Sequence, residues 1–138
     1  MQGELAAVGV TPGYERIVVD GPRVTLPHLD MQLLALALHE LATNALKHGA
    51  LKGSRGRIDV RWQMLDPMNT PRLELVWVES GVELDEPEAS SFGRGFGREL
   101  LELALPYQLD ATTKLDLTQD GVRFSAVIPW HDDERREP

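Results

Sequence analysis

The sequence contains no cysteine. This absence excludes disulfides, cysteine-ligated zinc and thiol nucleophiles, so any chemistry must come from carboxylates, amides, histidines, basic groups or the backbone. No apolar run approaches the roughly 18 residues that a membrane span needs. Residues 1–9 also lack the basic and then apolar order of a secretory signal. We therefore expect a cytoplasmic protein that makes no membrane contact through this region.

Positive charge is also in short supply. The 22 Asp and Glu residues outnumber the 14 Lys and Arg residues, which leaves a formal net charge of −8 at pH 7. A protein that binds nucleic acid normally meets the phosphate backbone with a basic face, so this balance argues against a nucleic-acid partner. A single nucleotide stays compatible with it, because local N–H groups and a metal ion are enough to hold one.

What is present suffices for one globular domain. The chain has 138 residues, 42% of them hydrophobic, and shows neither an internal repeat nor a linker. We therefore expect a single domain over residues 1–138, in which the charged end, 131–138, is frayed.

Hydrophobic periodicity predicts an α/β (α+β) two-layer sandwich, a mixed β-sheet with helices on one face. Strands are expected at 14–19, 23–26, 58–62, 73–79, 113–117 and 122–128, with the last two forming a hairpin. A long helix is expected over Met31–Lys47, with Asp30 as its N-cap and Gly49 as its stop. Residues 80–97 are expected to form a mobile loop, followed by a helix over residues 98–105 that Pro106 ends.

The long helix has two distinct sides. An apolar stripe with helical spacing predicts the side that packs on the sheet, namely Met31, Leu34, Leu38, Leu41 and Ala45. Glu40, Asn44, Lys47 and His48 project from a second, polar side. Their spacing alone fits an ordinary solvated face equally well. Asn44 favours a ligand-binding role, because asparagine is a mediocre helix former in the middle of a helix.

The segment His39–Ala45 resembles the N-box of the GHKL ATPases, with its Glu-x-x-x-Asn core. The resemblance implies that the Asn44 amide oxygen coordinates a Mg²⁺ ion bridging the nucleotide phosphates. It also implies that Glu40 is the base, or orients the attacking group. Lys47 and His48 are then candidate nucleotide contacts.

A second motif, Trp77–Gly81, ends one of the expected strands. In the GHKL family an acidic residue here accepts a hydrogen bond from the adenine amino group, a role that falls on Glu79, followed by Gly81. Trp77 and Glu79, taken with His39 in the N-box, resemble the signature of the HWE subclass of sensor histidine kinases. The two-residue period of a strand places Trp77 and Glu79 on one face, so a core tryptophan precedes a carboxylate at the pocket rim.

A third motif, Gly93–Gly97, precedes the second expected helix. Alone, such a glycine run is more often a flexible loop than a phosphate site. Its place after the Glu79 strand resembles the glycine motif of HWE kinases. The candidate phosphate contacts are Arg94, Gly95, Phe96, Gly97 and Arg98. Val122 stands where many relatives carry a hydroxyl, which weakens the expectation of a phosphate contact there.

The resemblance covers residues 33–129 and implies a Bergerat-type ATP-binding fold. It implies a domain that binds Mg-ATP and donates the γ-phosphoryl group to a histidine on its own separate helical dimerisation domain. A response regulator would then receive the group, and the full-length protein would be a homodimer. Two alternatives stay open: a GHKL-type anti-sigma serine kinase, and a nucleotide-binding or interaction module without transfer. Of the remaining histidines, His28 and His131 are expected at the surface and His39 as a structural hydrogen bonder.

Overall fold

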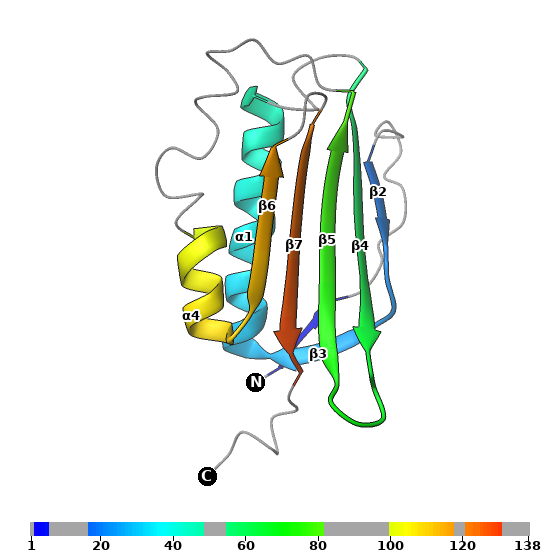
Figure 1. Cartoon of the computed structure of the whole chain (residues 1–138), viewed down its shortest axis with the longest axis vertical. Helices are drawn as coiled ribbons and strands as arrows, with labels where there is room; N and C mark the ends of the chain where they lie inside the picture. Colours follow the sequence, from blue (N-terminus) through cyan, green and yellow to red (C-terminus); the bar gives the residue numbers. More distant parts are fainter. Residues whose placement is uncertain (1, 6–16, 49–54, 82–99, 118–120, 131–138) are drawn as a thin grey trace.

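The architecture is one mixed sheet with helices on a single face. The structure, a computed structural model, describes residues 2–5, 17–48, 55–81, 100–117 and 121–130. Within these residues, a five-stranded sheet has the order β2-β4-β5-β7-β6, and α1 and α4 lie together on one side of it (Figure 1). The predicted mixed sheet with helices on one face is therefore confirmed.

The elements follow one another with little connecting chain in the described parts. They are β1 Gln2–Leu5, β2 Ile17–Asp20, β3 Val24–Pro27, α1 His28–His48, β4 Arg57–Leu65, β5 Arg72–Ser80, the π-helical turn η1 Leu100–Ala104, α4 Leu105–Leu109, β6 Thr112–Leu117 and β7 Val122–Pro129. The pairing of β2 with β4 is parallel, and the pairings β4–β5, β5–β7 and β6–β7 are antiparallel. The predicted C-terminal hairpin of β6 and β7 is thus confirmed.

Helix α1 packs on the sheet through one stripe of small and branched residues. Leu34, Ala37, Leu41 and Ala45 are all 0% exposed and lie three or four residues apart, which puts them on one helix face. The helix begins at His28, so the predicted N-cap at Asp30 is wrong. Asp30 lies instead in the first turn, where its negative charge interacts favourably with the unpaired N–H groups at the start of the helix.

The second helical segment extends past the proline that was expected to end it. The turn η1 leads into α4, which continues to Leu109 and ends at Asp110 in the left-handed conformation, with φ 55°. Pro106 lies in the first turn of α4, where its missing N–H removes no helical hydrogen bond. A proline after Leu105 therefore starts this helix and does not stop it.

The strands expected around Asp20–Pro22 exist, but they do not pair with each other. β2 joins β4 in the large sheet, whereas β3 pairs with β1 in a separate two-stranded sheet, and β1 itself was not expected. The connection packs against β4: the Trp62 indole N–H donates to the Pro22 carbonyl at 2.7 Å. A side chain at Gly21 would overlap the Trp62 ring, so the close approach requires glycine.

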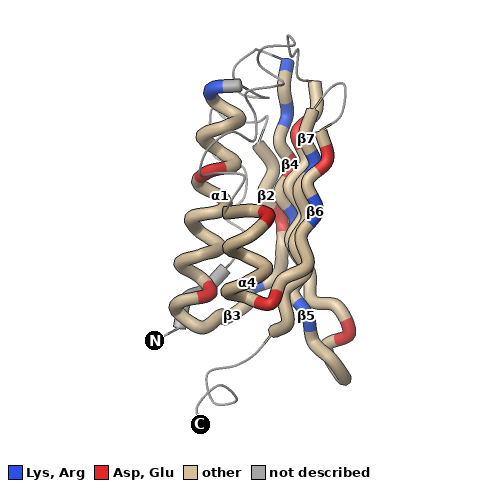
Figure 2. The backbone as a smooth tube through the Cα atoms, turned by 60° about the vertical axis from the view of Figure 1, so that its left-hand side comes forward, with Lys and Arg blue, Asp and Glu red and all other residues tan. Residues whose placement is uncertain are grey.

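The two faces of the sheet differ in composition. The helix-covered face is apolar, with Ile58, Val60, Trp62, Leu73, Leu75, Trp77, Phe124, Ala126 and Ile128 buried beneath α1 and α4. Alternate residues of the same strands project to the other face, which we call the open face, and acidic and basic positions are spread along these strands (Figure 2). Among the described residues, no helix is long and apolar enough to cross a membrane.

Candidate functional site

The polar side of α1 lies near the end of the helix where the chain leaves it. Glu40 and Asn44 are half-buried and lie one turn apart, while Lys47 is exposed on the last turn, which ends at His48. The C-terminal end of α1 and the end of β5 lie at the same end of the molecule (Figure 1). The fold thus brings two of the three sequence motifs to one end of the helix-covered face.

At the end of β5, a buried tryptophan is bonded to a buried carboxylate. Trp77 is 5% exposed and Glu79 is 3% exposed. The Trp77 indole N–H donates to Oε2 of Glu79 at 2.9 Å. Both side chains point toward the helix-covered face, as the strand period predicts, but Glu79 lies beneath the surface and not at an exposed rim. A buried carboxylate needs hydrogen-bond donors, because its desolvation is otherwise costly, and Trp77 supplies one.

Two glycines let the backbone pass close to Glu79. Gly81 has φ 70°, a left-handed conformation, and a Cβ there would lie 2.6 Å from the Arg55 carbonyl oxygen. A Cβ at Gly121 would overlap the carbonyl oxygen of Glu79. The sequence predicted only a hairpin of the last two strands here and did not reveal this contact. The signal was a glycine directly before Val122, the residue that pairs with Glu79 across the sheet.

The described residues suit a magnesium ion held with few protein ligands. No three His, Asp or Glu side chains gather into a metal site in the described part of the chain. Glu40 and Asn44 offer hard oxygen atoms one turn apart, and both are half-buried. Mg²⁺ commonly binds through one or two protein oxygens, with phosphates and water completing its octahedron. The donor set therefore fits Mg²⁺ together with a nucleotide.

Other expected site residues fall elsewhere. Arg94, Gly95, Phe96, Gly97 and Arg98 lie outside the described residues, as does the expected loop over 80–97 beyond Gly81. The His39 side chain is exposed, and the His39 carbonyl accepts a hydrogen bond from the Thr43 hydroxyl at 2.9 Å. The expected hydrogen bond from the His39 imidazole is not found among the described contacts. Val122 is 3% exposed and pairs with Glu79 across the sheet, so an apolar side chain is buried where a hydroxyl was considered.

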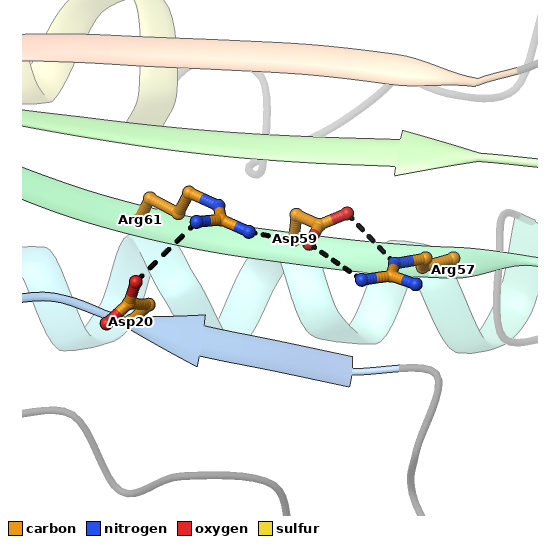
Figure 3. Close-up of polar contacts among 4 residues, drawn as sticks. All are labelled: Asp20, Arg57, Asp59 and Arg61. Atoms are coloured by element: carbon orange, nitrogen blue, oxygen red, sulfur yellow. Dashed lines mark hydrogen bonds and ion pairs between the residues drawn. The ribbon is translucent and has the colours of Figure 1, made fainter.

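A separate hollow of about 780 Å³ lies on the open face. Its charged walls are paired with one another: Arg61 contacts Asp59 at 3.6 Å and Asp20 at 3.5 Å, and Arg57 contacts Asp59 at 3.2 Å (Figure 3). Of the described motif residues, Val78 lines this hollow, whereas Glu40, Asn44, Trp77 and Glu79 do not. Trp77 and Glu79 therefore lie on the face of the sheet opposite to the hollow.

Known proteins similar to this chain are histidine kinases. No protein-family model matches the chain. A curated protein, blue-light-activated histidine kinase 1 of Erythrobacter litoralis, is 34% identical over 120 residues, which cover 87% of this chain and 32% of that protein. The chain is thus homologous to histidine kinases and has the fold of their catalytic domains. The resemblance to GHKL-type histidine kinases that the motifs indicated is confirmed.

Two solved structures share the fold of this chain. The histidine kinase domain of a blue-light-activated histidine kinase from Erythrobacter litoralis aligns over 86% of this chain and 54% of its own, with a TM-score of 0.61 and 20% identity. The histidine kinase ThkA, solved in complex with the response regulator protein TrrA, aligns over 83% of this chain and 34% of its own, with a TM-score of 0.50 and 20% identity. The chain spans about a third of the curated relative, so the activity of a whole kinase is a matter for proposal.

Proposed function

We propose that this domain binds Mg-ATP and donates the γ-phosphoryl group to a histidine on a separate helical dimerisation domain. The observation that carries the proposal is the buried Glu79 carboxylate, bonded to Trp77, at the end of the sheet where α1 presents Asn44. A buried acceptor at the end of a strand suits an adenine amino group, which is a donor.

The residues of α1 have distinct proposed tasks. The Asn44 amide oxygen binds Mg²⁺, and Mg²⁺ when bound neutralises charge on the phosphates. Glu40, one turn earlier, orients the attacking imidazole or accepts its proton. Lys47 and His48, on the last turn of α1, contact the phosphates, as do residues 94–98 of the glycine motif.

The reaction is an in-line displacement at phosphorus. A nitrogen of the acceptor histidine forms a bond to the γ-phosphorus while the bond to the β,γ-bridging oxygen breaks, and ADP leaves with that electron pair. None of the four histidines of this chain is the acceptor. His48 lies on the nucleotide's own helix, where its side chain cannot swing in line behind the γ-phosphorus.

The proposed partners follow from the reaction. The proposed acceptor domain is a helical domain of the same protein, and its helices make the full-length protein a homodimer. A response regulator takes the phosphoryl group next, a step that the ThkA–TrrA complex supports. Within this scheme the domain acts in the cytoplasm, where ATP is available, and needs no nucleic acid.

Incubation with γ-labelled ATP tests the proposal. The chain alone should bind ATP and remain unlabelled. Addition of the dimerisation domain as a separate piece should give acid-labile, base-stable label on that piece, at a rate limited by docking because the covalent tether is absent. Stable label on this chain's histidines would overturn the division of labour. Acid-stable phosphoserine on a partner would favour a serine kinase, and binding without transfer would leave a nucleotide-binding module.

A further inference from the structure

The tryptophan beside the base-recognising carboxylate offers a role that goes beyond packing. Trp77 could bury its ring in the core without any specific partner, as core aromatics often do. Its N–H instead donates to Oε2 of Glu79 at 2.9 Å. Both residues are buried, with Trp77 5% exposed and Glu79 3% exposed. We propose that Trp77 is a positioning residue that sets the selectivity of the site for adenine by fixing the carboxylate of Glu79.

The geometry of the carboxylate explains why fixing it matters. A free glutamate side chain rotates about its last bond, so either oxygen can face a ligand. A donor bonded to Oε2 holds the carboxylate plane and commits that oxygen to the protein. The orientation of the acceptor toward the nucleobase is then set before the nucleotide arrives, which reduces the ordering cost of binding.

The backbone under Glu79 is held as tightly as its side chain. Gly121 packs so close to the Glu79 carbonyl that no side chain fits between them. The ladder pairs Glu79 with Ile58 on one side and with Val122 on the other. The ladder and Gly121 thus hold the backbone of Glu79, and the Trp77 indole restrains its side chain.

A matched tryptophan is present in the same core. Trp62 is 4% exposed, and its indole N–H also bonds to one acceptor, the Pro22 carbonyl at 2.7 Å. Replacing either tryptophan with phenylalanine keeps a ring in the core and removes one indole donor. Only Trp77→Phe removes a donor from Glu79, so a general loss of core stability should appear in both variants and a loss of selectivity in one.

The inference rests on the proposed nucleotide site, and its test compares two nucleotides. Calorimetry with Mg-ATP and Mg-ITP suits the purpose, because ITP carries an oxygen acceptor at the position of the adenine amino donor and lacks the extra amino group of guanine. The unsubstituted chain should prefer ATP by at least about tenfold, the worth of one hydrogen bond to a charged group. Trp77→Phe should reduce that preference to about threefold or less, mainly through weaker ATP binding. Trp62→Phe should keep it within about twofold of the original.

Glu79→Gln gives a second reading that a purely structural tryptophan would not produce. The Trp77 N–H should attract the oxygen of the new amide, which turns the NH₂ group toward the base. A donor facing the base favours the O6 atom of ITP, so the preference should shift toward ITP by about tenfold or more. Adding Trp77→Phe to Glu79→Gln should abolish this shift, because the amide can then rotate. The two residues should therefore show strong non-additivity.

The outcomes separate the inference from the function beneath it. If the unsubstituted chain bound neither nucleotide, the proposed function would fail, and the role of Trp77 with it. If it preferred ATP and Trp77→Phe kept that preference, or lost ATP and ITP affinity equally, the positioning role alone would be overturned. Glu79→Gln shifting toward ITP equally with and without the tryptophan would also overturn it.

Discussion

The two faces of the central sheet use charge in opposite ways. On the helix-covered face the carboxylate of Glu79 lies 3% exposed with an indole donor at 2.9 Å. On the open face Asp20, Asp59 and Arg61 form contacts of 3.5 and 3.6 Å, and the Arg61 and Asp20 side chains are 59% and 67% exposed. Exposed pairs contribute little because water screens them, whereas a buried charge must be held by specific partners. The proposed site therefore lies on the face where a buried charge has a specific partner.

The largest expected effect is on stability, from Gly121→Ala beneath the helix-covered end of the sheet. The new methyl group would overlap the Glu79 carbonyl, so β5 and β7 must separate locally. We expect a loss of roughly 3–4 kcal/mol in the free energy of unfolding, measured by urea denaturation. Ser125→Ala, on the open face of the same strand, should change it by less than about 0.5 kcal/mol. Equal losses of stability in the Gly121 and Ser125 variants would contradict the close approach of Gly121 to the Glu79 carbonyl.

Glu40→Gln should slow phosphoryl transfer by about 100-fold while ATP affinity changes by less than about threefold. A residue that orients or deprotonates the attacking group acts chiefly in the transition state. Labelled transfer to the separately supplied dimerisation domain measures the rate, and calorimetry measures the affinity. Glu74→Gln, the same change on the open face, should leave both quantities unaltered. A Glu40 variant that transfers normally but binds ATP poorly would reverse the assigned role.

Asn44→Ala should weaken Mg-dependent ATP binding by on the order of 30-fold, because the metal then keeps only phosphates, water and any help from Glu40. Calorimetry with and without Mg²⁺ isolates the metal-dependent part. Gln63→Ala removes an amide from the open face, where it donates to Glu74 at 2.9 Å, and should leave ATP affinity unchanged. Identical Mg-dependent affinity in the Asn44 variant would remove that residue from the site.

The smallest effect is expected from Asp20→Asn on the open face. Its ion pair with Arg61 spans 3.5 Å between largely exposed side chains. Such pairs are worth about 0.5 kcal/mol, which high salt reduces further. Thermal unfolding at low and high salt should reveal this small, salt-sensitive loss, and ATP affinity should not change. A loss above about 2 kcal/mol would show that the open-face charges matter more than their exposure suggests.

Local patterns were sufficient to predict most elements and the layer arrangement. The alternation in 73–79 and the helical stripe of α1 are properties of short segments. The alternation is confirmed, and so is burial of Leu34, Leu41 and Ala45, whereas Met31 and Leu38 are only partly buried against the core. The separation of β2 from β3 was not predictable in this way, because strand pairing is a contact between distant segments. The predicted helix end at Pro106 was wrong because proline is common both in the first turn of a helix and just after a helix ends.

The candidate site was likewise predictable only where it depends on spacing within one segment. Period two placed Trp77 and Glu79 on one face, but the donation from the indole to Oε2 depends on side-chain rotamers that spacing does not encode. The close approach of Gly121 depends on the register of β5 with β7, which the sequence does not reveal. The roles of Asn44, Glu40 and the glycine motif remain predictions.

The central claim is that nucleotide binds on the helix-covered face at the end of β5, and the three tryptophans of the chain offer a direct test. Their indole N–H groups have different acceptors: Pro22 for Trp62, Glu79 for Trp77 and Thr25 for Trp130. Each should give its own signal in a ¹⁵N-edited NMR spectrum, assigned by tryptophan-to-phenylalanine substitution. Addition of Mg-ATP should move the Trp77 signal strongly and leave those of Trp62 and Trp130 nearly in place. A shift of the Trp62 signal with the Trp77 signal unmoved would contradict the claim, because the Trp62 indole bonds to Pro22 in the wall of the open-face hollow.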